Sequence, residues 1–270
     1  MPYVGRLITL VTLMVGLCLQ PLNAWGLSPT RFDDFDHYTL ALTWHPGFCA
    51  TEGEARPECR DQHAYPSLVL HGLWPSLPAT LAAQGMTQRQ WWQEGCFHFT
   101  APERSGFCAA SPPLSLDKQL TNELAHDMPG STSCLERHEY AKHAVCFGVT
   151  ANDYFATALA LRDTLADSVF GDYLRIHTGA AIGRNELIDV FENVFGRGKG
   201  RALKLQCRRD GARSLLTEVQ VGIKADALDT FPASASLATL GTGNCATTIC
   251  LDAPGEGRPA DRTRTARSKG

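Results

Sequence analysis

Alternating apolar and polar positions predict strands in the first third of the chain. The segment His37–Trp44 alternates in this way, which is typical of a half-buried strand, and a turn is expected at Pro46 and Gly47. Residues 67–70 form a second, short apolar strand, which places His71 at its end.

The same alternation returns in the last third of the chain. Residues 202–207 and 215–224 are expected to form paired strands, and residues 245–251 an additional edge strand. Strands that follow one another in runs, rather than alternating with helices, indicate an α+β fold. We therefore predict a single domain, held by disulfides, with a central, largely antiparallel sheet flanked by helices.

Between these strands, four segments show helical patterning. These segments are residues 116–126, 134–145, 152–168 and 185–195. Ser131 or Ser133 is expected to cap the second helix and Asn152 the third. Residues 77–115 are rich in Pro, Gly and Cys, and predict a long loop region with a short helix at residues 87–92.

The two ends of the chain differ from this pattern. After Arg6, an apolar run of 13 residues from Leu7 to Leu19 is too short to span a bilayer comfortably, and a small-residue cleavage site follows. We therefore predict that residues 1–24 are a signal peptide and that the protein is exported. Residues 254–270 are rich in Gly, Pro, Arg and Ser, and predict a disordered basic tail, either a polyanion-recruiting segment or a plain solvated terminus.

Composition limits the partners without identifying one. The 270 residues carry 25 Lys and Arg against 28 Asp and Glu, so the net charge is mildly negative. Such a balance does not indicate a polyanion partner, and any affinity for nucleic acid must come from local placement of charge.

Export changes the interpretation of the cysteines. Cys18 leaves with the predicted signal peptide, so nine of the ten cysteines stay in the mature chain. In an oxidising compartment they most simply form disulfides, whereas a zinc site is a weak alternative because no Cys-x-x-Cys pair occurs. Since nine is odd, we expect four bridges and one free thiol, with Cys250 as the free one because it lies so close to Cys245.

Two short clusters concentrate histidine. One is Leu70-His-Gly-Leu-Trp-Pro75, and the other is Arg137-His-Glu-Tyr-Ala-Lys-His143. With about 100° between successive residues of a helix, the four polar groups of the second cluster share one face. These groups are His138, Glu139, Lys142 and His143. A solvated face is the usual origin of such a pattern, but that face normally mixes many Lys and Glu rather than two imidazoles.

A metal site is the first alternative for the second cluster. The zincin pattern His-Glu-x-x-His needs its two histidines one above the other on the helix. Here His138 and His143 are five residues apart, and Lys142 would place a positive charge beside the ion. We therefore predict no metal and no cofactor.

Cleavage of RNA fits the two clusters without a metal. RNA carries its own nucleophile, the 2′-hydroxyl, so the protein must supply a base for that proton and an acid for the departing 5′-oxygen. It must also supply cations for the charge that develops on the phosphate. Two histidines can serve as base and acid, while a third histidine and a lysine hold the phosphate oxygens.

Both clusters closely resemble the two active-site segments of the ribonuclease T2 family. The resemblance extends through Trp44-His-Pro-Gly-Phe-Cys49 and the cysteine series to Cys245, and it is nearest to the bacterial periplasmic members. It covers most of residues 33–251 and implies that residues 25–253 form the catalytic domain.

The resemblance implies a role for each residue of the clusters. His143 would be the general base that takes the 2′-proton, and His71 the general acid for the 5′-oxygen. His138 would bind phosphate. Glu139 and Lys142 would stabilise the pentavalent transition state.

The chain departs from the family pattern in two places. The family segment usually continues Lys-His-Gly-Thr-Cys, whereas Ala144 and Val145 precede Cys146 here and add bulk that could alter the pocket. Trp74 matches a family position that stacks on a base, with a core position as the alternative. The second departure follows Pro75. Some fungal members carry an acidic residue at this position, whereas this chain has Ser76, so broad base specificity is expected.

The resemblance also implies a disulfide pattern. By that pattern the expected bridges are Cys49–Cys59, Cys96–Cys146, Cys108–Cys134 and Cys207–Cys245. The Cys96–Cys146 bridge would tie the predicted catalytic helix to the loop region of residues 77–115.

These observations predict a periplasmic or secreted endoribonuclease that cleaves single-stranded RNA by metal-independent transesterification. Its product would be a 2′,3′-cyclic phosphate, hydrolysed more slowly to a 3′-phosphate. RNA is the expected partner of a monomer that needs no membrane contact and no obligate protein partner. The alternatives are a catalytically impaired, exported RNA-binding protein on the same scaffold and a secreted metallohydrolase. The intact active-site set favours the enzyme over the first alternative.

Overall fold

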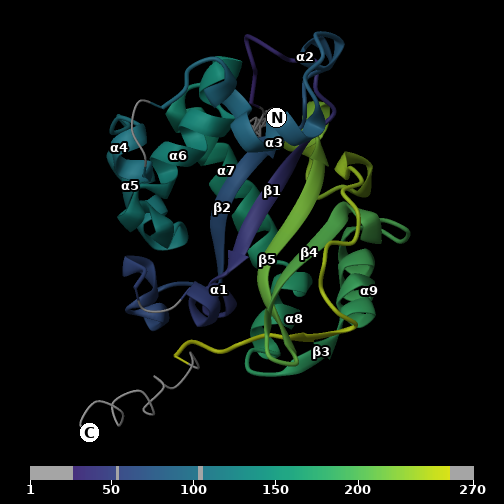
Figure 1. Ribbon diagram of the computed structural model, residues 1–270. Helices are drawn as coiled ribbons and strands as arrows, with labels where there is room; N and C mark the ends of the chain where they lie inside the picture. The colour runs from purple at the N-terminus through teal and green to yellow at the C-terminus, as the bar shows by residue number, and fades with distance from the viewer. Residues whose placement is uncertain (1–26, 53–54, 103–105, 256–270) are drawn as a thin grey trace, which may run out of the picture.

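The computed structural model describes residues 27–52, 55–102 and 106–255 (Figure 1). The predicted signal peptide and nearly all of the predicted basic tail lie outside these ranges. Within them, one sheet has the strand order β2-β1-β5-β6-β3, and β4 pairs with β5 beside this path. Every pairing is antiparallel except the contact between β5 and β6, which confirms the predicted α+β fold with a largely antiparallel sheet.

The strands lie close to the predicted positions, with two differences. Their bounds are β1 His37–Trp44, β2 Leu68–Pro75, β3 Ala181–Gly183, β4 Leu203–Asp210, β5 Arg213–Lys224 and β6 Thr248–Cys250. The predicted pair is the β4–β5 hairpin, which turns at Gly211 with φ 60°. The prediction of an edge strand near the C-terminus is wrong, because β6 lies between β5 and the short strand β3, which the pattern did not reveal.

Helices pack around this sheet on both sides (Figure 1). Their bounds are α1 His45–Glu52, α2 Ala79–Ala83, α3 Gln88–Glu94, α4 Phe107–Ala110, α5 Lys118–Asp127, α6 Leu135–His143, α7 Ala151–Ala166, α8 Val169–Ile176 and α9 Arg184–Phe195. In Figure 1, α4, α5 and α6 lie to the left of β2, and α9 lies to the right of β4. Side chains from β1 and β5, such as Leu40, Leu42 and Val219, are fully buried between these layers.

The longest helix of the described ranges is α7, with 16 residues. No single helix there combines the length and apolar character needed to cross a bilayer. A bent pair, Leu135–Phe147 with Ala151–Ala166, meets that test only when the two are taken together, with 111° between them.

The predicted turn after β1 is wrong, because α1 begins directly at His45. Proline is tolerated in the first turn of a helix, so Pro46 does not oppose this start. Gly47 lets α1 lie directly on β5, since a Cβ there would stand 1.9 Å from the Leu216 carbonyl oxygen. The disulfide from Cys49 to Cys59 then ties the helix to the loop that follows it.

The predicted serine cap of the second helix is also wrong. Ser131 and Ser133 belong to a separate 3₁₀ turn, Pro129–Ser133, and α6 begins after Cys134 with no side-chain cap. Cys134 has φ 62° and is bonded to Cys108, so a disulfide holds the start of α6. The helix ends at His143, two residues before its predicted end.

Thr150, rather than Asn152, caps the next helix. Its side chain accepts a hydrogen bond from the Asp153 backbone N–H at the start of α7. The Asn152 side chain instead accepts from the Asp117 backbone N–H. The helix ends at Ala166, two residues before its predicted end, and Ser168 caps the separate helix α8.

The four disulfides are those that the family resemblance implies. They join Cys49 to Cys59, Cys96 to Cys146, Cys108 to Cys134 and Cys207 to Cys245. Among the described cysteines, Cys250 has no disulfide, as expected from the odd count.

Helix α7 covers the open edge of β2. An edge strand leaves outward N–H and C=O groups that need partners. The Tyr154 hydroxyl is the partner of both outward groups of Leu73. It accepts a hydrogen bond from the backbone N–H and donates one to the carbonyl oxygen, each at 3.0 Å. Nearby, the Arg162 guanidinium donates from Nε and Nη2 to the Leu68 carbonyl oxygen. Side chains of one helix therefore complete the strand that carries the first histidine cluster.

We expect Tyr154→Phe to lower the free energy of unfolding by about 1–3 kcal/mol, because two buried backbone groups of Leu73 lose their partner. Tyr173→Phe is the matched control, since its hydroxyl donates to Glu186 on the exposed surface. That control should change stability by less than about 0.5 kcal/mol. Urea denaturation with intact disulfides measures both; equal losses would contradict the role of Tyr154 at the strand edge.

Candidate active site

His71 lies within β2, at an irregularity in its pairing with β1. Gly72 pairs with Ala41 and Leu70 pairs with Leu42, so His71 is an extra residue on β2 with no partner. The predicted position at the end of a short strand is therefore wrong. A bulge of this kind redirects a side chain, and here it lets His71 and Trp74 lie on the same side with ring centroids 5.1 Å apart. Without it, the alternation of a strand would send them to opposite faces.

The buried carboxylate of Glu139 joins the two histidine clusters. Its side chain lies on α6 and is 2 % exposed. The Trp74 indole N–H donates to Glu139 Oε2 at 2.6 Å. The same carboxylate lies 3.7 Å from His71 Nε2 through Oε1, and 3.9 Å from His143 Nε2 through Oε2. One carboxylate thus contacts a residue of each cluster.

Glycine at position 72 makes this contact possible. A Cβ at Gly72 would stand 2.1 Å from Glu139 Oε2 and 2.6 Å from Trp74 Nε1. Both atoms belong to the hydrogen bond that joins α6 to β2. Any larger residue would therefore displace the carboxylate.

Glu218 on β5 is a site residue that the sequence analysis missed. His71 Nδ1 lies 2.6 Å from Glu218 Oε2, and since a carboxylate accepts, the imidazole N–H donates to it. The Gln220 side chain donates to the other Glu218 oxygen. Glu218 is 147 residues from His71 in the sequence and belongs to no recognisable motif, so only its place in a strand that pairs with β1 brings it here.

Carboxylates on both sides favour the charged form of His71. Burial by itself lowers the pKa of this imidazole, but the hydrogen bond and charge of Glu218 and the charge of Glu139 outweigh it. They raise the pKa of His71 to about 9. His71 is therefore protonated at neutral pH, with a side chain that is 31 % exposed.

The pKa values of the two histidines on α6 are lowered rather than raised. Burial, together with the charges of Lys142, His138 and His71, lowers the pKa of His143 well below its usual value. Burial and the charge of Lys142 lower the pKa of His138 to about 4. Burial also lowers the pKa of Lys142, although the charge of Glu139 opposes this. The neutral imidazole of His143 and the protonated imidazole of His71 therefore contact the same carboxylate.

Glu139 itself shows competing effects. Burial raises the pKa of its carboxyl, while the charge of His71 and the hydrogen bond from Trp74 lower it. The Trp74 indole N–H is a donor only, so it must meet an accepting oxygen whatever the protonation state. This bond holds the carboxylate in place between the imidazoles.

Trp74 packs against both histidines of the cluster. Its ring centroid is 5.1 Å from that of His71 and 5.5 Å from that of His143. Its indole N–H also donates to Glu139, so Trp74 contacts three of the cluster's side chains and helps to hold them in position. It is half-buried and still lines a cavity.

The two residues that depart from the family pattern lie away from this cluster. Ala144 is fully buried in the apolar core behind α6. Val145 is exposed and lines a different cavity, beside Phe97 and Arg137. His143 belongs to neither environment, so the added bulk does not enter the pocket around it.

Two cavities flank the cluster. The first, of about 470 Å³, is lined by Trp74, Lys142 and His143 and reaches Trp92. The second, of about 300 Å³, is lined by His71 and Glu218. The protonated and the neutral imidazole therefore face different cavities.

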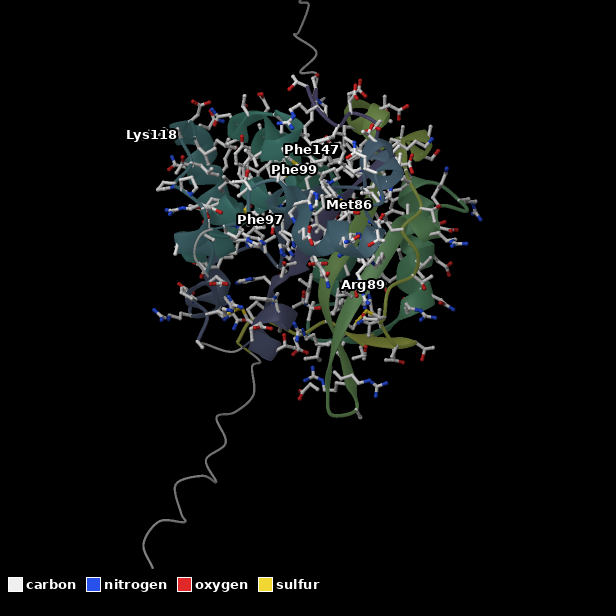
Figure 2. All side chains as sticks on the ribbon, turned by 45° about the horizontal axis from the view of Figure 1, so that its top comes forward. Met86, Arg89, Phe97, Phe99, Lys118 and Phe147 are labelled. Carbon is white, nitrogen blue, oxygen red and sulfur yellow. A yellow bond between two sulfur atoms is a disulfide. The ribbon has the colours of Figure 1, made fainter. Side chains whose placement is uncertain are left out.

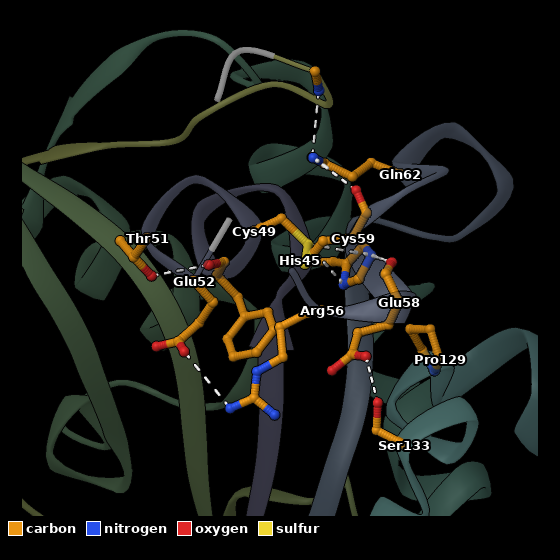
Figure 3. The surroundings of a disulfide bond; sticks show 12 residues. His45, Cys49, Thr51, Glu52, Arg56, Glu58, Cys59, Gln62, Pro129 and Ser133 are labelled. Carbon is orange, nitrogen blue, oxygen red and sulfur yellow. Dashed lines mark hydrogen bonds and ion pairs between the residues drawn. A yellow bond between two sulfur atoms is a disulfide. The ribbon is translucent and has the colours of Figure 1, made fainter. Parts of the chain in front are cut away.

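Residues beside the Cys49–Cys59 disulfide, among them Glu52, Arg56 and Glu58, line the second cavity (Figure 3). Arg56 forms an ion pair with Glu52, and Glu58 accepts a hydrogen bond from the Ser133 hydroxyl. Charged side chains thus line the same cavity as His71.

The described side chains offer no metal site. Among them, no three His, Cys, Asp or Glu residues are grouped so that they could hold a metal ion. The cluster around Glu139 instead combines imidazoles with an ammonium and an indole N–H.

Comparison with known proteins gives a consistent result. The model of the Ribonuclease T2 family matches residues 35–245. The chain is 36% identical to Ribonuclease I of Escherichia coli (strain K12) over 248 residues, which cover 86% of this chain and 92% of that protein. It is 29% identical to a ribonuclease of Aeromonas hydrophila over 161 residues, 58% of this chain and 59% of that protein.

Solved structures share the fold at low sequence identity. The SF11-RNase of Nicotiana alata superimposes with a TM-score of 0.51 and 18% identity, covering 82% of this chain and 100% of its own. Trichomaglin, described as an S-like ribonuclease, gives a TM-score of 0.50 and 18% identity, covering 81% of this chain and 98% of its own.

We expect the His71 imidazole to titrate near pH 9 in NMR spectra of the folded protein. Glu218→Gln should lower that pKa, because it removes the charge and the best acceptor for the Nδ1 proton. Since folding raises this pKa above the usual 6.5, the stability that it contributes is complete below pH 6.5 and is lost as the pH rises through 9.

Glu94→Gln is the control for this titration, since Glu94 pairs with the exposed His98. It should leave the His71 signal unchanged. A His71 pKa near its usual value in the wild type, or no change in Glu218→Gln, would refute the assignment of Glu218.

Proposed function

Because the chain belongs to the ribonuclease T2 family, we propose that it is an endoribonuclease that cleaves single-stranded RNA through the RNA's own 2′-hydroxyl. One observation carries the mechanism: a protonated and a neutral imidazole lie on opposite sides of one buried carboxylate. Acid–base catalysis of transesterification needs this combination at the start of each turnover.

His143 is the proposed general base. Its lowered pKa keeps it neutral, so it can accept the proton of the 2′-hydroxyl. The 2′-oxygen then attacks phosphorus, and a new P–O bond forms as the bond to the 5′-oxygen breaks. Because the base needs no prior deprotonation at neutral pH, the step can proceed whenever substrate is bound.

His71 is the proposed general acid. Its raised pKa keeps a proton available for the departing 5′-oxygen, and the bond from Nδ1 to Glu218 leaves Nε2 to deliver it. The products of this step are a 2′,3′-cyclic phosphate and a free 5′-hydroxyl. Glu218 is thus proposed to be a positioning residue, because it orients the acid and maintains its charge.

Other groups of the cluster stabilise the charge on phosphorus. The Lys142 ammonium, beside Glu139, is proposed to hold phosphate oxygens as negative charge develops. His138, neutral with a pKa of about 4, is proposed to bind phosphate by donating a hydrogen bond. Glu139 is proposed to hold the imidazoles of His71 and His143 in position relative to each other.

Hydrolysis of the cyclic phosphate would use the same groups in reverse. After the first step His71 is neutral and His143 is protonated. His71 can then take a proton from water as the water attacks phosphorus, and His143 can return a proton to the 2′-oxygen. The product is a 3′-phosphate, and both histidines regain their starting states.

Broad base specificity is also proposed. Ser76, which stands where some fungal members have an acidic residue, accepts hydrogen bonds from the backbone N–H groups of Asp36 and His37. Its oxygen therefore serves the backbone rather than a base edge. Export through residues 1–24 completes the proposal, supported by four disulfides of the kind that persist in oxidising compartments.

We expect the mature protein to cleave a defined RNA dinucleotide in the presence of EDTA and to release a 2′,3′-cyclic phosphate. The same deoxyribonucleotide should stay intact, because it lacks the attacking hydroxyl. Chromatography and mass spectrometry identify the products. Activity that depends on added metal would favour the metallohydrolase, and RNA binding without turnover would favour the impaired RNA-binding protein.

We expect His71→Phe and His143→Phe each to reduce kcat by at least about 100-fold, the usual range for loss of a general acid or base. His126→Phe is the control, because His126 pairs with Asp127 on the exposed surface. Circular dichroism should show the same fold for all three variants. A fully active variant at either position would remove that residue from the mechanism.

The dependence of kcat/KM on pH offers a separate test. Activity should fall as the pH rises through about 9, where His71 loses its proton, and should fall in acid only well below pH 6.5, where His143 gains one. Glu218→Gln should move the alkaline limb to lower pH. An alkaline limb that does not move would contradict the assignment of His71 as the acid.

A further inference from the structure

Two arginines from separate segments share one carboxylate at the second cavity. Arg56 Nη2 lies 3.6 Å from Glu52 Oε2, an ion pair that Figure 3 shows, and Arg208 Nη2 lies 3.5 Å from Glu52 Oε1. Arg56 is in the loop after α1, whereas Arg208 is on β4. All three side chains line the cavity of about 300 Å³ that His71 also lines. The carboxylate of Glu52 therefore balances only one of two positive charges.

The other carboxylates of this cavity have partners of their own. Glu218 accepts a hydrogen bond from the protonated His71. Glu58 is 5 % exposed and accepts a hydrogen bond from the Ser133 hydroxyl. A second anion at the two guanidinium groups would give each of them one counter-charge.

The two ion pairs also leave guanidinium N–H groups for a further acceptor. Distances of 3.5 Å and 3.6 Å exceed the usual length of an N–H···O hydrogen bond, about 2.7–3.2 Å. The planar fork of a guanidinium matches a phosphate through two parallel N–H···O bonds. Arg208 is accessible for this, since its side chain is 65 % exposed. Arg162 differs, because it is buried and donates to the Leu68 carbonyl oxygen.

Arg208 lies where the second cavity meets a groove along β4 and β5. This groove has a volume of about 440 Å³ and shares Arg208, Thr217 and Glu218 with the lining of the cavity. It continues to Gln206 and Asn244. In Figure 2, side chains that end in nitrogen, drawn blue, project from the β4–β5 hairpin. A strand of RNA that leaves the cavity along this groove would pass Arg208.

We propose that Arg208 and Arg56 bind the phosphate on the 3′ side of the departing nucleotide, one phosphate beyond the cleaved bond. This inference rests on the proposed function. His71, the proposed acid, protonates the departing 5′-oxygen and lines the second cavity, so the departing nucleotide lies on that side of the cluster. Its 3′-phosphate is the next anion along the RNA, and the two guanidinium groups are the cations that share a single carboxylate there.

We expect a 3′-phosphate on the substrate to raise kcat/KM about 2- to 5-fold, mainly through KM, which is the range for one exposed ion pair. The substrates are adenylyl-(3′,5′)-deoxyadenosine with and without a terminal 3′-phosphate. Their second sugar has no 2′-hydroxyl, so each contains a single cleavable bond. Arg208→Gln should bring the ratio of the two kcat/KM values close to 1, whatever its rate with the shorter substrate.

Arg209→Gln is the matched control for the protein. Arg209 follows Arg208 on β4 and is also exposed, but it lines neither this cavity nor the groove. Both substitutions remove one positive charge, so Arg209→Gln tests for an effect of overall charge and should keep the wild-type ratio. A 5′-phosphate on the same dinucleotide is the control for the substrate, and Arg208→Gln should leave its effect unchanged.

Glu52→Gln should change the ratio in the opposite direction. The phosphate would then meet two guanidinium groups without a competing carboxylate, so the gain from the 3′-phosphate should exceed that of the wild type. Circular dichroism should show the same fold for all the variants.

Binding of the fully 2′-deoxy dinucleotide, with and without the 3′-phosphate, keeps the test independent of catalysis. Calorimetry should give the tighter binding with the phosphate in the wild type and equal binding in Arg208→Gln. In the wild type, the phosphate should also make the slope of log affinity against log salt steeper by about 0.7, the value for one phosphate contact on a single strand.

The outcomes separate this inference from the proposed function. A wild type that cleaves neither substrate refutes the proposed function, while the deoxydinucleotides still test the phosphate position through binding. A wild type that gains nothing from the 3′-phosphate, or a gain that survives in Arg208→Gln, refutes the phosphate position. An equal loss in Arg209→Gln would also overturn it, because the gain would then come from overall charge.

Discussion

The buried carboxylate of Glu139 is the contact on which the site depends. It joins α6 to β2 through the Trp74 indole N–H and lies within 4 Å of an imidazole from each element. A buried carboxylate is costly unless donors surround it, and here the donors are the groups that the chemistry needs. Gly72 leaves the room for it, since any Cβ at that position would occupy the place of its oxygen. The packing of helix on strand and the geometry of the proposed catalyst are therefore one arrangement.

Around this carboxylate, neighbouring charges give chemically identical side chains different properties. His71 lies between Glu139 and Glu218, which favour its protonated form. His143 is more buried and has Lys142 and His138 beside it, which favour its neutral form. Both effects come from placement, because an isolated imidazole titrates midway between them. The division into acid and base is thus a property of the cluster.

The scaffold fixes both sides of this cluster. Helix α6 is held at its start by the disulfide from Cys134 to Cys108, and just after its end by the one from Cys146 to Cys96. On the other side, α7 covers the edge of β2, and β1 joins β2 to the strand that carries Glu218. The bulge in β2 then turns His71 toward the site. Covalent and hydrogen-bonded constraints therefore meet at the same few residues.

The sequence by itself determined the local features of this protein. Periodicity predicted β1, the β4–β5 hairpin and most of the helices, because the apolar stripe of each element is written in adjacent residues. The two histidine clusters and the cysteine series were enough for the family and the disulfides, since both follow from short motifs in order. Strand β3 was missed because its three residues are too few to show a period, whereas α8 was missed although it is longer than the predicted helix α3.

Only the tertiary structure decided how these features combine. It added Glu218, which pairing between distant strands brings to His71, and it showed that Trp74 lies against both imidazoles. It also separated Ala144 and Val145 from the pocket around His143. The physical reason is common to all of these. Protonation, exposure and contact depend on neighbours in space, and those neighbours come from segments that lie far apart in the chain.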